Sequence, residues 1–146
     1  MYKRILLAYD GSESGQKALL DSLDIAQWSQ AEVHLVAVMP RLATTYAGLE
    51  GGLYLNESED DEKGRFQGIL DEGLHRLASA GYPARGEVVV GEPVTEIATC
   101  ASRIGADLIV IGHKHLDSWA ARWWRGSTSP ALIEHAPCSV LVSITH

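Results

Sequence analysis

The residues best suited to chemistry lie in two short segments that each follow an apolar run. The first is Asp10-Gly11-Ser12, and the second extends from Gly112 to Thr128 and ends in Gly126-Ser127-Thr128. A carboxylate can bind a divalent ion, and backbone N–H groups and hydroxyls at a helix N-terminus can bind a phosphate. Each segment also has a structural interpretation, because an acid after a strand is a common turn residue and Ser after Gly is a common helix N-cap. Both interpretations stay open.

The second segment is also rich in basic and aromatic residues. Its basic side chains either contact a phosphate or lie on a solvated loop: His113, Lys114, His115, Arg122 and Arg125. Its tryptophans either cover an apolar surface or stack on a base: Trp119, Trp123 and Trp124. The His-x-His spacing can ligate a metal, but no third ligand is evident nearby in the sequence, so we assign no metal site.

Other polar and nucleophilic residues receive a structural interpretation. Cys100 and Cys138 lack the spacing of a zinc or redox motif, so we expect two packing thiols. His34, which lies among apolar neighbours, is expected to be structural or exposed. Ser12 and Ser127 are not part of a nucleophile elbow. We therefore name no catalytic residue.

Short apolar runs alternate with segments of helical periodicity, which predicts a parallel sheet with helices on both faces. Ser12 is the expected N-cap of the first helix, and Pro93 suits the first position of the third. A long loop is expected over 41–56, and Gly112 is expected to end the central strand. The predicted strands are 4–9, 33–38, 86–90, 107–111 and 139–144, and the predicted helices are 13–28, 57–80, 93–104 and 127–135. The predicted core includes Ile5, Leu7, Leu35, Val89, Ile109, Ile111 and Leu141.

Length and composition limit the class of protein. The 146 residues fit one domain, 1–146, and 46% hydrophobic with 21% charged residues is a balance typical of a folded domain. A net charge of −7 argues against nucleic acid or an anionic membrane as a partner. No apolar run is long enough to span a bilayer, and Asp10 comes too early for a secretory signal, so we expect a cytoplasmic protein.

Four segments together resemble the universal stress protein family over nearly the whole chain. They are residues 5–12, the Gly91-Glu92-Pro93 turn with Ile97, the strand 107–112, and Gly126-Ser127-Thr128 with residues 136–142. The resemblance implies a single-domain, three-layer α/β fold whose five-stranded parallel sheet has the order 3-2-1-4-5. It also implies a homodimer, which we assign to the C-terminal strand because its apolar residues would otherwise form an exposed edge.

One branch of the family binds ATP through a loop with the spacing Gly-two-Gly-nine-Gly-Ser/Thr, and another branch lacks it. Gly112 matches the first glycine and Gly126-Ser127 the last pair, but His115 replaces the second glycine and ten residues separate it from Gly126. By the same resemblance, Asp10 would lie near the phosphates or Mg²⁺ and the Val38 backbone near adenine. With Thr128, these are the expected binding residues for ATP or AMP.

The sequence therefore leaves two functions open. The first is a stress-response dimer that acts through protein partners, with nucleotide binding undecided. The second is an ATP- or AMP-binding switch with at most slow hydrolysis.

Overall fold

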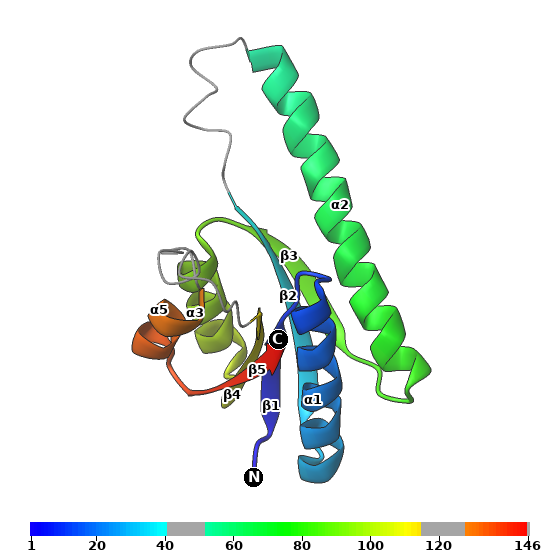
Figure 1. Cartoon of the computed structure of the whole chain (residues 1–146), viewed down its shortest axis with the longest axis vertical. Helices are drawn as coiled ribbons and strands as arrows, with labels where there is room; N and C mark the ends of the chain where they lie inside the picture. Colours follow the sequence, from blue (N-terminus) through cyan, green and yellow to red (C-terminus); the bar gives the residue numbers. More distant parts are fainter. Residues whose placement is uncertain (41–51, 115–127, 146) are drawn as a thin grey trace.

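The fold is a three-layer sandwich with a parallel sheet in the middle, seen in a computed structural model (Figure 1). The structure describes residues 1–40, 52–114 and 128–145, and the side chains of these residues except 52–59, 128 and 129. The strands are β1 (Arg4–Ala8), β2 (Glu32–Met39), β3 (Arg85–Val90), β4 (Leu108–Lys114) and β5 (Ser139–Thr145). The helices are α1 (Glu13–Ser29), α2 (Gly52–Ser79), α3 (Pro93–Ile104) and α5 (Thr128–His135).

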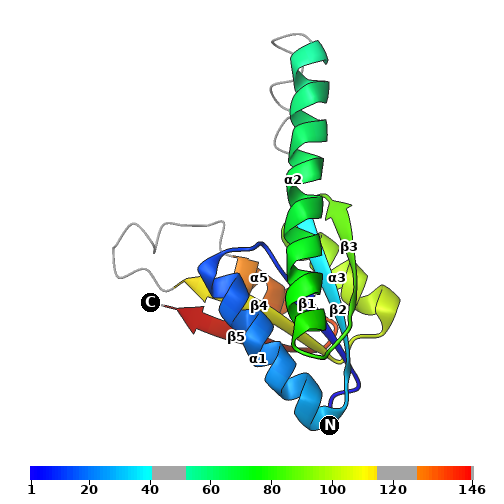
Figure 2. The same ribbon diagram turned by 90° about the vertical axis from the view of Figure 1, so that its right-hand side faces the viewer.

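The five strands are hydrogen-bonded in the order β3-β2-β1-β4-β5, and every pairing is parallel. This confirms the expected sheet and strand order. α1 and α2 cover one face of the sheet, and α3 and α5 cover the other (Figures 1 and 2). In both views the amino-terminal half of α2 projects beyond the sheet.

Alternation along the strands divides the core into two clusters, because successive side chains of a strand point to opposite faces. In β1, Ile5 and Leu7 pack beneath α1 and α2, whereas Leu6 packs against the α3 side. Both faces of β1 are therefore apolar, as expected of a strand buried on both sides. Val89 and Leu141 are only partly buried, because β3 and β5 are the edge strands.

The helix ends follow local chemistry. The Ser12 side chain caps α1 by accepting a hydrogen bond from the Gly15 amide at 3.1 Å, and Pro93 is the first residue of α3, both as predicted. Glu92 caps α3 by accepting hydrogen bonds from the amides of Val94 and Thr95.

Two boundaries differ from the prediction by more than one residue, and the central strand is not the one predicted. The expected loop 41–56 is wrong for residues 52–56, which belong to α2, and 41–51 lie outside the described residues. β4 does not end at Gly112, because its pairing with β5 continues to Lys114 opposite Thr145. The middle strand is β1, and β4 lies next to it. Within the described residues, no helix is both long and apolar enough to cross a membrane.

Candidate functional site

Two neighbouring strands, β1 and β4, end side by side, and the chain leaves them toward opposite faces of the sheet. β1 leads into α1 on one face, whereas α5 follows β4 on the other. Loops diverge at such a point, which is where open α/β sheets form a ligand-binding crevice. Asp10 follows β1, Gly112 lies near the end of β4 and Val38 near the end of β2. The structure thus brings these three predicted site residues to one edge of the sheet.

Asp10 organises the turn between β1 and α1. Its Oδ1 accepts hydrogen bonds from the Ser12 amide at 3.0 Å and the Ser12 hydroxyl at 2.5 Å. Gly11 between them has a φ of +77°, a left-handed conformation that favours glycine. Asp10 is therefore a turn residue, as one of the two interpretations predicts, because its Oδ1 bonds to Ser12 within the turn. The Asp10 residue is exposed, so the carboxylate remains accessible at the carboxyl end of β1.

Gly112 permits a very close approach between β4 and the first turn of α1. A Cβ at position 112 would lie 2.7 Å from the amide nitrogen of Gly15 and even closer to the carbonyl oxygen of Ser14. A Cβ at Gly15 would in turn lie 2.6 Å from Asp10 Oδ1. Real Cβ atoms do not approach other atoms this closely, so both glycines serve helix–strand packing. The first glycine of the predicted loop has a structural role that its motif does not reveal.

Val38 lies where β2 extends beyond β1. The last β1–β2 pair joins Ala8 to Val36, and the Tyr9 amide donates to the Val36 carbonyl at 2.9 Å. On its other side, Val38 pairs with Val89 of β3. Its backbone therefore flanks the crevice on the β2 side, which is the position expected for a contact with adenine.

The remaining predicted site residues are only partly placed. Thr128 is the first residue of α5, but its side chain is not described. His115, Gly126 and Ser127 lie outside the described residues, as do Arg122, Arg125 and the three tryptophans. Their expected roles stay predictions.

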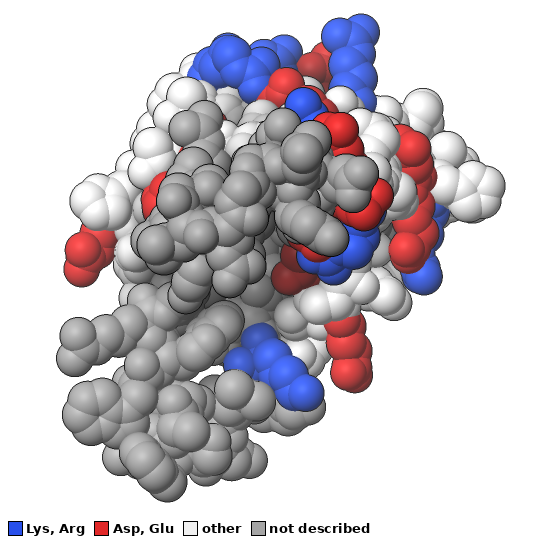
Figure 3. Space-filling view, turned by 90° about the horizontal axis from the view of Figure 1, so that it is seen from above, with Lys and Arg blue, Asp and Glu red and all other residues white. Residues whose placement is uncertain are grey.

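The described charges near this edge are mixed. Lys114, at the end of β4, is exposed and His113 is partly buried. Viewed from above, basic and acidic side chains lie beside one another over the described surface (Figure 3). Among the described residues, Lys114 is therefore a single cation near this edge that could bind an anion, and they do not form a broad basic surface.

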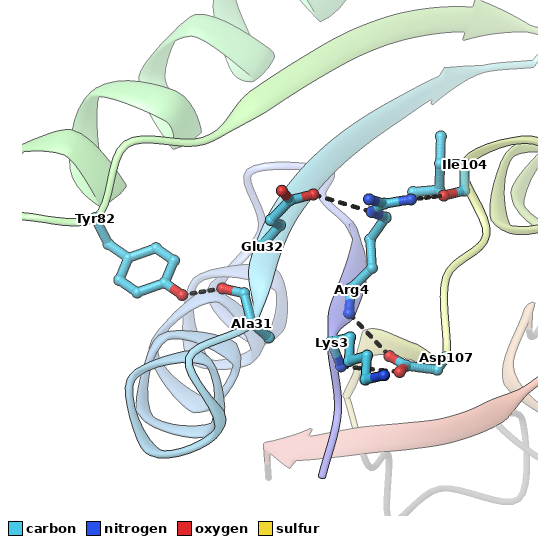
Figure 4. A network of polar contacts seen from close by, with 7 residues as sticks. All are labelled: Lys3, Arg4, Ala31, Glu32, Tyr82, Ile104 and Asp107. Atoms are coloured by element: carbon cyan, nitrogen blue, oxygen red, sulfur yellow. Dashed lines mark hydrogen bonds and ion pairs between the residues drawn. The ribbon is translucent and has the colours of Figure 1, made fainter.

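A second hollow lies at the opposite edge of the sheet. It has a volume of about 990 Å³, and the starts of β1, β2 and β3 line it together with the end of α3. Arg4 spans its rim, where Nε donates to Glu32 at 3.0 Å and Nη1 donates to the Ile104 carbonyl at 2.6 Å (Figure 4). Across the hollow, the Tyr82 hydroxyl donates to the Ala31 carbonyl.

Comparison of the sequence with known proteins shows the family to which the chain belongs. The model of the Universal stress protein family matches residues 1–143. This chain belongs to that family. It is 31% identical over 147 positions to the universal stress protein YxiE of Bacillus subtilis (strain 168), an alignment that covers 97% of this chain and 99% of YxiE. A putative universal stress protein of Staphylococcus haemolyticus is 32% identical, with 97% of this chain and 84% of that protein covered.

Solved universal stress proteins share the fold. One from Burkholderia pseudomallei superposes with a TM-score of 0.73 at 26% identity, covering 97% of this chain and 95% of that one. Another, in complex with cAMP, gives 0.70 at 25% identity with 99% and 98% covered. A family member from Arabidopsis thaliana with AMP bound gives 0.71 at 15% identity with 99% and 92% covered, a likeness of fold alone.

Sequence reasoning missed one cluster in this universal stress protein. His34, Glu87 and Cys100 lie together beside the second hollow, although 66 residues separate the first from the last. Burial raises the pKa of the Cys100 thiol to about 11, and the charge of Glu96 adds to the shift. Cys100 is buried in the apolar cluster beneath α3, as a packing thiol would be, but its Sγ also contacts the Glu87 carboxylate. Two sequence patterns could have suggested this grouping. Side chains alternate between the two faces of β2 and β3, and helical spacing in α3 places Cys100 on its buried face.

Proposed function

We propose that this protein is a cytoplasmic stress-response protein that binds an adenine nucleotide at the crevice between β1, β2 and β4. The observation that carries the proposal is the convergence of Asp10, Val38 and Gly112 at the point where the chain leaves β1 and β4 toward opposite faces. The solved relative with bound cAMP, which has the same fold over nearly the full length, supports the ligand class.

Each described residue has a distinct role in this proposal. The Val38 backbone would meet the base, and the exposed Asp10 carboxylate would help to hold Mg²⁺, which would offset the negative charge of the phosphates. The phosphate would lie at the start of α5, which begins at Thr128, where a helix N-terminus favours an anion. Gly126 and Ser127, which precede Thr128 in the sequence, are the further residues that the family resemblance assigns to the phosphate. Lys114 adds a charge-assisted donor. In this proposal the protein acts as a switch with at most slow hydrolysis.

Titration calorimetry and thermal unfolding with AMP, cAMP and ATP plus Mg²⁺ test the proposal. Binding should raise the melting temperature, and Gly126→Asp should remove that rise because it adds a carboxylate beside the phosphates. Gly68→Asp is the matched control, since a side chain there, on α2, meets open space. If millimolar nucleotide produces no heat and no thermal shift, the chain belongs to the branch that does not bind nucleotide, and we then expect it to act through protein partners alone.

We also propose a homodimer formed through β5. This strand is at the edge of the sheet, and Ile144 at its end is 47% exposed. Pairing with a second copy would cover Ile144 and the outer backbone groups of β5. Light scattering should give the mass of two chains at micromolar concentration, and Ile144→Asp should give one. Trp28→Asp, at an exposed apolar residue of α1, should remain dimeric. A single-chain mass for the unmodified protein rules the dimer out.

A further inference from the structure

Three side chains with metal-ligating atoms converge near the amino-terminal edge of the sheet. They are His34 of β2, Glu87 of β3 and Cys100 of α3, and their ligating atoms all lie within 4.8 Å of one another. Glu87 Oε1 lies 3.8 Å from His34 Nε2 and 3.2 Å from Cys100 Sγ. This cluster lies on the amino-terminal side of Val38 in β2 and Val89 in β3, and so is separate from the carboxyl ends of the strands.

The fold itself produces this convergence. β2 and β3 pair with Val36 opposite Glu87, so His34 and Glu87 are on the same face as Val36. α3 covers that face with the buried residues Ile97, Cys100 and Ala101. Cys100 is only 2% exposed and therefore points at the sheet, toward the two strand residues.

The distances fit a tetrahedral metal ion. Zinc binds nitrogen, oxygen and sulfur at about 2.0–2.3 Å, which places its ligands roughly 3.3–3.8 Å from one another. Two of the three separations, 3.2 Å and 3.8 Å, lie close to this range. The third pair, His34 and Cys100, lies within 4.8 Å.

His34 provides an independent sign of a ligand. Its Nε2 is buried and has no hydrogen-bond partner among the described residues. A buried ring nitrogen without a partner is costly, and such groups call for an explanation.

We propose that His34, Glu87 and Cys100 form a Zn²⁺ site. The combination of imidazole, carboxylate and thiolate suits Zn²⁺ rather than Mg²⁺ or Ca²⁺, which take oxygen ligands. When the zinc–sulfur bond forms, the Cys100 proton passes to the buffer. Three protein ligands leave a fourth position for water on the side of the hollow, which His34 and Arg103 line.

Arg103 occupies the side of the Glu87 carboxylate and the Cys100 sulfur that a metal ion would need. Its Nη2 contacts Glu87 Oε1 and lies 3.4 Å from Cys100 Sγ. The Arg103 side chain is 53% exposed, so it can move outward into the hollow when a dication takes its place. Removal of this nearby positive charge should tighten zinc binding on the order of tenfold, since a charge at this distance shifts ionic equilibria by about one log unit or more. If Glu87 only forms an ion pair with Arg103 and the cluster binds no zinc, removal of Arg103 should not increase zinc affinity.

Zinc titration of the full-length, chelator-treated and reduced protein tests the site. We expect one Zn²⁺ per chain at micromolar protein, and a Co²⁺ form with thiolate-to-metal absorption. Cys100→Ser should weaken binding at least about 100-fold and remove that absorption, whereas Cys138→Ser, the same change at the other thiol, should alter neither. Arg103→Ala should bind more tightly.

A second measurement covers the case in which Cys100→Ser does not fold. In Cys138→Ser protein, Cys100 is the remaining thiol, and Zn²⁺ should slow its alkylation. His34→Ala should abolish this protection, whereas His75→Ala, on α2, should retain it. Stoichiometric zinc that survives Cys100→Ser in folded protein, the absence of any one-to-one binding, or alkylation unaffected by zinc would each overturn the proposal.

Discussion

Gly112 of β4 lies directly against the backbone of Ser14 in the first turn of α1. The contact leaves no room for a side chain, because a Cβ at position 112 would also lie 2.7 Å from the Gly15 amide nitrogen. The contact joins β4 to the turn that Asp10 and Ser12 organise. The packing of β4 against α1 and the position of this turn therefore depend on the same glycine.

Gly112→Ala should lower the free energy of unfolding by about 1–3 kcal/mol, because the added methyl group must push strand and helix apart. Denaturant unfolding monitored by circular dichroism measures the loss. Gly68→Ala is the matched control, because Gly68 lies in α2 with open space around it, and the change should stabilise the protein by up to about 1 kcal/mol. Equal effects at the two positions would contradict the close contact.

Ile109→Ala should cost about 2–5 kcal/mol of unfolding free energy. Ile109 is fully buried in β4 and packs in the cluster beneath α3, so truncation removes apolar contact and leaves a cavity. Ile133→Ala on α5 is the control, because Ile133 is 60% exposed and its loss should change stability by less than about 0.5 kcal/mol. A wild-type denaturation midpoint for Ile109→Ala is incompatible with this placement.

Local signals in the sequence were sufficient for most of the fold. Apolar runs located β1 and β2 to within a residue or so at each end, and hydroxyl and proline signals located the starts of α1 and α3. The order of the strands came from the family resemblance rather than from periodicity. The prediction that Gly112 ends β4 is wrong. A glycine that ends a strand cannot be distinguished, in the sequence alone, from a glycine that allows another backbone segment to pack closely against the strand.

The candidate sites were less accessible to sequence reasoning. The positions of Asp10 and Val38 at the carboxyl ends of β1 and β2 follow from the apolar runs, whereas their roles toward a nucleotide come from the family resemblance and stay predictions. The grouping of His34, Glu87 and Cys100 could not, because it depends on pairing between β2 and β3 and on the rotation of α3 about its axis. Neither is fixed by residues adjacent in the chain.

Asp107 should make the stability depend on pH below about 4. Its carboxylate accepts hydrogen bonds from the amides of Lys3 at 2.8 Å and Arg4 at 3.0 Å, which ties the start of β4 to β1 (Figure 4). Burial alone would raise the pKa of Asp107, but these backbone hydrogen bonds outweigh it and hold the pKa below its usual value of 3.8. The contribution is therefore complete above the unfolded pKa and is lost as the pH falls through the lower, folded pKa.

Asp107→Asn tests this contribution, because asparagine keeps the shape but not the charge. At pH 7 the variant should lose about 0.5–1.5 kcal/mol of unfolding free energy, the range of a partly exposed hydrogen bond. The difference from the wild type should shrink as the pH falls below about 4, where the wild-type carboxyl also becomes neutral. Denaturant titrations at pH 7 and pH 3 measure the difference in unfolding free energy between the two proteins. A difference that grows at low pH would contradict a lowered pKa for Asp107.

His115→Gly should strengthen the binding of an adenine nucleotide. His115 replaces the second glycine of the family's nucleotide-binding loop, and a glycine there allows the backbone to approach phosphate without a Cβ and an imidazole in between. Calorimetry with ATP and Mg²⁺ should show at least a severalfold lower dissociation constant than for the unmodified chain. His75→Gly is the matched control, because this change on α2 leaves the loop intact. An unchanged or weaker affinity would mean that His115 does not obstruct the site and that the longer segment before Gly126 sets the affinity instead.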